Sequence, residues 1–192
     1  LKYLLSLKKD TGNPTVNLTF VATTLNIEDL PNFVRLASNL GVDKVICYYN
    51  YIYIPTQKYL SCFFKKDLTN EIVLQSEELS KRLGMRVDFP PRFDLKNYPT
   101  VGVCREAWSQ IMFTSQGHVL PCDASEDCNE SLEDKNLMDI WNGPYYQALR
   151  ASLIERSTSC FKYCLRANPS AVNDFRSHVI RRGRKVSEID IL

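Results

Sequence analysis

Apolar residues are spaced differently in the two halves of the chain. Up to about residue 100, apolar runs typical of strands alternate with segments whose apolar residues recur every three or four positions. The runs are Val16 to Ala22, Val45 to Ile54 and Met85 to Phe89. Their alternation with helices predicts right-handed crossovers and a parallel sheet. The first run is mostly apolar, which is typical of a strand buried on both faces.

Two helices are expected between these strands. Asn26 can cap the first, with Asp29 in a capping-box position, and Gly41 is a natural stop. Asn70 can cap the second, and Gly84 can end it. The predicted apolar faces are Leu30, Phe33, Val34, Ala37 and Leu40 for the first helix, and Ile72, Leu79 and Leu83 for the second.

Beyond Cys104 the pattern changes to short elements. Gln110–Thr114 and His118–Leu120 flank a turn with Gly117, which predicts an antiparallel hairpin. One helical turn is expected at 137–141, followed by a helix that Pro144 opens. The apolar face of this helix is expected to be Tyr145, Leu149 and Leu153. The fold class is therefore α/β over residues 1–91, a linker at 92–103, and a small α+β domain over 104–192.

Composition narrows the class of protein. The 192 residues are 44% hydrophobic and carry a net charge of +2, which favours neither nucleic-acid nor membrane binding. No apolar run is long enough to span a bilayer, and the start lacks a signal peptide, so we expect a cytoplasmic protein. The chain begins with Leu inside an expected helix, which suggests a piece of a longer protein. Seven cysteines, an odd number, favour thiols kept for a metal over a disulfide scaffold.

Four cysteines are the candidate metal ligands: Cys104, Cys122, Cys160 and Cys164. The predicted hairpin can bring the first two together, and the CFKYC pair then arrives from the end of the following helix. Four thiolates suit zinc or an iron–sulfur cluster. The alternative is four unconnected buried thiols. Cys128 can replace a ligand, although an exposed spare thiol is the simpler interpretation.

These residues resemble a known family. Cys104, twelve residues, Gly117, four residues and Cys122 resemble the opening of the SPASM and twitch domains of radical SAM enzymes. DIWNGPYYQALRASL (139–153) resembles their tryptophan-bearing helix, and CFKYC resembles their closing pair, with one more intervening residue than the commonest twitch spacing. The segment VNLTFVATTLNIEDLPNFVRLASNLGVDKVICYYNYI resembles a late strand-helix-strand portion of the radical SAM partial barrel.

The resemblance implies that residues 1–91 are the C-terminal half of a partial TIM barrel and that 104–192 bind one auxiliary [4Fe–4S] cluster. It also implies S-adenosylmethionine and a second [4Fe–4S] cluster in an intact parent oxidoreductase or maturase, acting on a peptide or small molecule. Thr24 and Asn26 would face the S-adenosylmethionine. However, the chain has no CxxxCxxC motif, so it is expected to be inactive alone and no catalytic residue is assigned.

Simpler alternatives stand beside several of these assignments. The chain can be a non-enzymatic four-cysteine module that binds zinc or an iron–sulfur cluster, and Asn26 can be an ordinary helix cap.

Several other residues have simple structural interpretations. Cys47 and Cys62 are expected to be structural, and His118 to be solvated. The tyrosines of the second strand (Tyr48, Tyr49, Tyr51, Tyr53) can line a substrate pocket but suit a core. We expect the basic segment RRGRK (181–185) to be a solvated tail. Strand 16–22 is expected to be an exposed edge through which copies self-associate.

Overall fold

The computed structural model describes residues 1–11, 14–99, 101–115, 117–122, 130–133, 135–157 and 163–179, except for the side chains of 9–11. The chain divides into two compact units, Leu1–Asp94 and Leu95–Leu192. The division falls within the segment 92–103. Each unit is described by itself below.

The first unit is a three-stranded parallel sheet with helices between the strands. Its main elements are α1 (Lys2–Thr11), β1 (Asn17–Ala22), α2 (Leu30–Leu40), β2 (Lys44–Tyr49), α3 (Lys66–Leu83) and β3 (Val87–Asp88). Short 3-10 helices occupy Ile27–Asp29, Pro55–Leu60 and Cys62–Lys65. The strand order is β1-β2-β3 with both pairs parallel, so the predicted alternation of strands and helices is confirmed.

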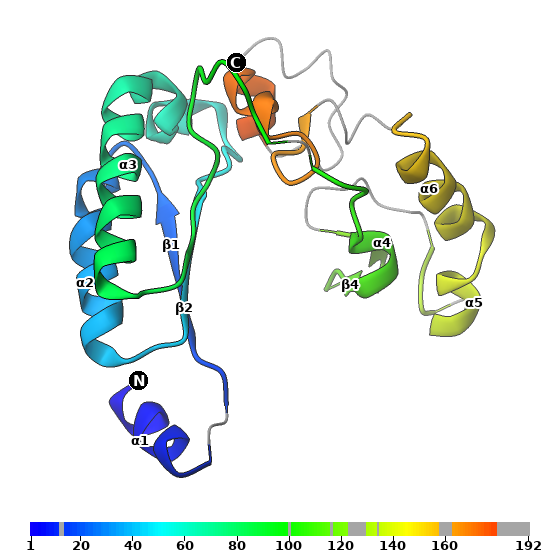
Figure 1. Cartoon of the computed structure of the whole chain (residues 1–192). Helices are drawn as coiled ribbons and strands as arrows, with labels where there is room; N and C mark the ends of the chain where they lie inside the picture. Colours follow the sequence, from blue (N-terminus) through cyan, green and yellow to red (C-terminus); the bar gives the residue numbers. More distant parts are fainter. Residues whose placement is uncertain are drawn as a thin grey trace. The chain divides into compact units, whose positions relative to one another are not determined.

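The two long helices of this unit pack side by side, and α2 also lies against β1 and β2 (Figure 1). Phe20 of β1 contacts Phe33 of α2, with 5.1 Å between the ring centroids. Gly41 and Gly84 follow the two helices with φ of 72° and 63°. Because this left-handed conformation favours glycine, both predicted helix stops are confirmed.

The prediction that strand 16–22 is buried on both faces is wrong. Phe20 and Ala22 are buried, whereas Thr19 and Val21, which alternate with them along the strand, are exposed. Tyr48, the register partner of Val21 on β2, is 43% exposed. Helix α2 therefore covers one face of these strands, and the other face stays open among the described residues. β1 is the edge strand, since it pairs only with β2 in the part of the chain that the structure describes.

Two strands are shorter than their apolar runs. β2 ends at Tyr49 rather than Ile54, and a 3-10 helix begins at Pro55. β3 holds only two residues of the run 85–89. Pro90 and Pro91 follow β3, and proline cannot donate to a ladder. Tyr49 is the only one of the four tyrosines in 48–53 that is buried, so the aromatic strand is only partly core.

The predicted apolar face of α3 is partly wrong. Leu79 is buried, but Leu83 is 41% exposed. The buried positions of this helix are Thr69, Val73, Ser76, Leu79 and Ser80. Ser76 donates its hydroxyl to the carbonyl of Ile72 at 2.8 Å and Ser80 to that of Glu77 at 2.9 Å. Because these hydroxyls bond within the helix, small polar residues can occupy buried positions of α3. Hydrophobic periodicity alone does not predict such positions.

Both predicted asparagine caps are also wrong. Asn26 stands at the N-cap position of the 3-10 helix Ile27–Asp29, but its side chain makes no capping hydrogen bond. Its Oδ1 accepts from the backbone N–H of Thr23 at 2.7 Å, and its Nδ2 donates to the carbonyl of Val21 at 3.0 Å. Asn70 lies inside α3, which begins at Lys66. Its Oδ1 accepts from the backbone N–H of Phe93 at 2.7 Å, and its Nδ2 donates to the carbonyl of Phe93 at 3.0 Å. Asn70 therefore fastens the segment after β3 to the helix.

The second unit is built from short elements. They are α4 (Glu106–Ser109), β4 (Met112–Phe113), β5 (Val119–Leu120), α5 (Leu137–Trp141), α6 (Pro144–Ile154) and the 3-10 helices Pro169–Asn173 and Phe175–His178. β4 and β5 form the predicted antiparallel hairpin, although its strands are shorter than expected. The α5 helix and the opening of α6 at Pro144 are confirmed.

A small core joins the hairpin to the two helices. Val119, Ile140 and Tyr146 are buried together, and Trp141 and Tyr145 pack against them. Tyr146 rather than Tyr145 is the fully buried tyrosine of α6, together with Leu153. Among the described residues of both units, no helix combines the length and apolar character that crossing a bilayer requires.

Candidate metal centre

Cys104 and Cys164 lie within electrostatic reach of each other, although they are far apart in the sequence. Cys104 precedes α4, and Cys164 precedes the 3-10 helix that begins at Pro169. Both thiols are half-buried, and the charge of one acts on the other. Burial raises the pKa of the Cys104 thiol, and the backbone N–H of Glu106, which donates to it, offsets part of this rise. The structure thus brings together one thiol from each end of the predicted ligand set.

An ion pair lies beside these two thiols. Arg166 Nη1 is 3.2 Å from Glu106 Oε1. Charges on both side chains act on the Cys104 thiol: Glu106 raises its pKa and Arg166 lowers it. Each partner follows a predicted ligand by two residues, so the pair links the turn after Cys104 to the turn after Cys164.

Arg150 of α6 supports the segment that follows Cys104. Its Nε donates to the carbonyl of Ala107 in α4 at 3.0 Å. Its guanidinium carbon lies 4.7 Å from the centre of the Trp141 ring and 5.3 Å from that of Tyr146. A planar guanidinium can stack on rings and donate sideways at the same time. Arg150 therefore ties α4 to both helices of the unit's core.

The other two predicted ligands are placed differently. Cys122 lies two residues after the end of β5 and is half-buried. The hairpin does not join it directly to Cys104, because α4 lies between Cys104 and β4. Cys160 lies outside the described residues. Within the described part of the chain, no three Cys, His, Asp or Glu side chains gather closely enough to hold a metal ion, so the four-cysteine set stays a prediction.

The other cysteines and His118 are placed partly as the sequence predicted. Cys47 and Cys62 are buried in the first unit, as expected for structural thiols. His118 is not simply solvated: the side chain is half-buried and its Nδ1 is inaccessible to solvent. Cys128 and the segment RRGRK lie outside the described residues.

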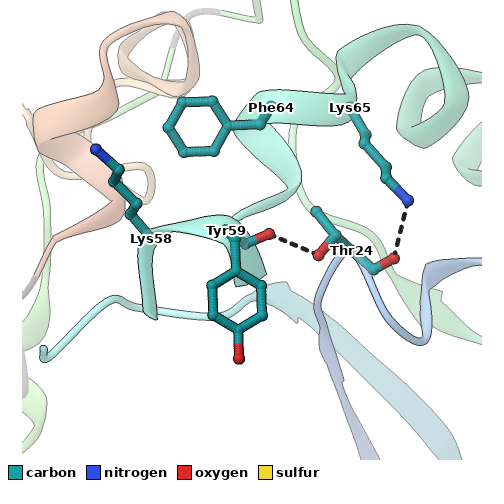
Figure 2. Close-up of a pocket in the computed structure, with 5 residues that line it drawn as sticks. All are labelled: Thr24, Lys58, Tyr59, Phe64 and Lys65. Carbon is teal, nitrogen blue, oxygen red and sulfur yellow. Dashed lines mark hydrogen bonds between the residues drawn. The ribbon is translucent and has the colours of Figure 1, made fainter. Parts of the chain in front are cut away.

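Thr24 lines a shallow pocket at the C-terminal end of β1, and Asn26 does not. The pocket has a volume of about 290 Å³ and is lined by Thr24, Lys58, Tyr59, Phe64 and Lys65 (Figure 2). The Thr24 hydroxyl donates to the carbonyl of Tyr59 at 2.7 Å, and Lys65 Nζ donates to the carbonyl of Thr24 at 3.4 Å (Figure 2). The backbone N–H of Thr24 donates to Leu60 at 3.0 Å. Both hydrogen-bond donors of Thr24 thus fasten its loop, and a role toward S-adenosylmethionine stays a prediction.

Comparison with protein families gives one match within the second unit. Residues 104–166 match the family model of the SPASM domain, an iron-sulfur cluster-binding domain. No curated protein matches the chain. The matched segment begins at Cys104 and includes Cys122, Cys160 and Cys164, which indicates iron–sulfur cluster binding by this part of the chain.

The described donors fit such a group. None of the described cysteines is in a disulfide, and thiolates are the ligands that iron–sulfur clusters take. The sequence patterns alone did not point to Glu106 and Arg166. The available signal was their spacing, since each stands two residues after a predicted ligand and they carry opposite charges.

Proposed function

We propose that this chain is the C-terminal part of a radical SAM enzyme whose second unit holds one auxiliary [4Fe–4S] cluster. The ligands would be Cys104, Cys122, Cys160 and Cys164. The observation that carries the proposal is the SPASM match, which starts at the first of these cysteines and contains all four. When bound, the cluster would relay electrons or help to hold the substrate.

The arrangement of the chain supports this assignment of the cysteines. Cys104 and Cys164 come within electrostatic reach of each other. Arg150 holds the segment after Cys104 against α6. A thiol pair held in place by the protein lowers the conformational entropy lost when a cluster binds.

Features of the first unit support the radical SAM part of the proposal. Its strands are parallel and in sequential order, with α2 on one face. In a (βα) barrel the opposite face of such a sheet lines the interior. The open face carries exposed Thr19, Val21 and Tyr48, which would line that interior in an intact parent. The parent would be an oxidoreductase or maturase, with a peptide or small-molecule substrate.

The metal content of the chain tests the cluster. The 192-residue protein would be purified without oxygen and assayed for iron, acid-labile sulfide and zinc. We expect nearly four irons and four sulfides per chain with a broad brown absorbance, as a [4Fe–4S] cluster requires. Cys104→Ala, Cys122→Ala, Cys160→Ala and Cys164→Ala should each lower the iron content, while Cys47→Ala, which replaces a buried thiol of the other unit, should not.

Three outcomes would each contradict part of the proposal. One zinc per chain with no colour would make this a structural four-thiolate module, which is the second candidate function. If the iron content fell in Cys128→Ala but not in Cys160→Ala, Cys128 rather than Cys160 would be the fourth ligand. For the radical SAM part, the coding sequence upstream of Leu1 should contain CxxxCxxC, and a parent without that motif would reject it.

A further inference from the structure

The pair formed by Glu106 and Arg166 has an unusual place in the chain. The two residues are sixty positions apart, yet Arg166 Nη1 lies 3.2 Å from Glu106 Oε1. Glu106 stands two residues after Cys104 and Arg166 two residues after Cys164. The ion pair therefore connects the two turns whose thiols approach each other.

Solvent exposure argues against stability as the main role of this pair. The Arg166 side chain is 60% exposed and that of Glu106 is 27% exposed. Exposed ion pairs contribute little to stability, because water screens the charges and two long side chains must be ordered. What distinguishes this pair from other surface pairs is its position, since it joins the turn that follows Cys104 to the turn that follows Cys164.

We propose that Glu106 and Arg166 are positioning residues of the cluster site, which hold the turns of Cys104 and Cys164 together and bias the reduction potential in opposite directions. This inference rests on the proposed cluster. Reduction adds one negative charge to an iron–sulfur cluster, and nearby charges are among the factors that set its potential. The Arg166 cation stabilises the reduced form, and the Glu106 carboxylate destabilises it.

The two residues can be tested one at a time. Glu106→Gln removes a negative charge while keeping the side-chain shape and the backbone N–H that donates to Cys104. Arg166→Gln removes the positive charge. The double exchange Glu106→Arg with Arg166→Glu restores an ion pair with its direction reversed. Glu78→Gln and Arg82→Gln, on exposed positions of α3 in the other unit, are the matched charge controls.

The experiment loads the 192-residue chain with Fe²⁺ and sulfide without oxygen, and titrates it with dithionite while absorbance reports the reduced fraction. We expect Glu106→Gln to raise the ratio of reduced to oxidised cluster at a fixed potential by about threefold, and Arg166→Gln to lower it by a similar factor. About threefold corresponds to roughly 30 mV for one electron. The controls should not change the ratio.

A purely structural role would not produce shifts of opposite sign. Shifts in the same direction, or unchanged potentials at full iron content, would overturn the inference and leave the proposed cluster intact. If either single variant loads less iron, the double exchange should regain it, and a double exchange that loads no better would overturn the positioning role. Wild-type protein that takes up no cluster would overturn both the inference and the proposed function.

Discussion

The guanidinium of Arg150 stacks on the indole of Trp141, with 4.7 Å from the guanidinium carbon to the ring centre. The same side chain donates from Nε to the carbonyl of Ala107. One residue thus joins α5, α6 and the helix that follows Cys104. The cation–π contact and the charged hydrogen bond both need the planar, delocalised guanidinium.

Arg150→Lys should therefore destabilise the second unit even though the charge is kept. We expect a loss of about 1–2 kcal/mol in the free energy of unfolding, since the stacking and the directed Nε bond both disappear. Urea unfolding followed by tryptophan fluorescence measures it. Arg35→Lys, on exposed α2, is the control and should change little. Equal midpoints for the two variants would mean that Arg150 has no special role.

Asn70→Ala should destabilise the first unit by about 2–3 kcal/mol, because both backbone groups of Phe93 lose their partner. Phe93 is 1% exposed, so water cannot replace the amide without local opening. Alanine is the better helix former, so helix propensity alone predicts the opposite sign. Thermal unfolding measures the change, with the exposed Asn39→Ala as control. A stabilised Asn70→Ala protein would contradict the fastening role.

Gly143→Ala should lower stability by about 2 kcal/mol, because a Cβ there would lie 2.7 Å from the carbonyl oxygen of Asp139 and 3.2 Å from that of Ile140. Both contacts are to backbone, which cannot rotate away. Gly102→Ala is the matched control, since a Cβ at that position meets nothing within 4 Å. Urea midpoints of the two variants should differ clearly, and indistinguishable midpoints would show that the junction of α5 and α6 is adaptable.

Cys47 and Cys62 should resist alkylation in the folded protein. Burial raises the pKa of Cys47 to about 12, with a further contribution from Cys62, and burial raises the pKa of Cys62 to about 11. Only the thiolate reacts, so at pH 8 the reactive fraction falls by about a hundredfold or more relative to an ordinary cysteine. Because both pKa values are raised, the rate should still be increasing with pH at pH 10.

Peptide mass spectrometry after iodoacetamide treatment measures this reactivity. Each cysteine is compared with itself in the chain unfolded by guanidinium, where all seven should react. Rapid labelling of Cys47 or Cys62 in the folded chain at pH 8 would contradict the burial of these thiols.

Copies of the chain should associate through β1 at high concentration. This strand is the edge of its sheet within the described residues, and Val21 on its open face is 37% exposed. Val21→Lys should reduce the association, because a lysine on an edge strand opposes pairing. Light scattering across a concentration series measures it, with Leu36→Lys on α2 as control. A wild-type protein that remains monomeric throughout would reject the edge contact.

Sequence patterns predicted those features that depend on residues close together in the chain. Apolar runs and the glycines at 41 and 84 determined the order of strands and helices, since backbone preferences and hydrophobic periodicity act over a few residues. The spacing of Cys104, Gly117 and Cys122 and the CFKYC pair pointed to the SPASM segment that the family match then covered. Each of these features depends on the type and spacing of residues within a short segment.

Tertiary structure decided what depends on distant partners. The sequence favoured Asn70 as a helix cap, but its amide bonds the backbone of Phe93, 23 residues away, because the fold brings that segment against α3. The pairing of Glu106 with Arg166 across sixty residues follows from the meeting of two turns, which no local pattern encodes. The sequence by itself determined the elements and the thiols, and only the packing of the chain decided which polar groups stand beside them.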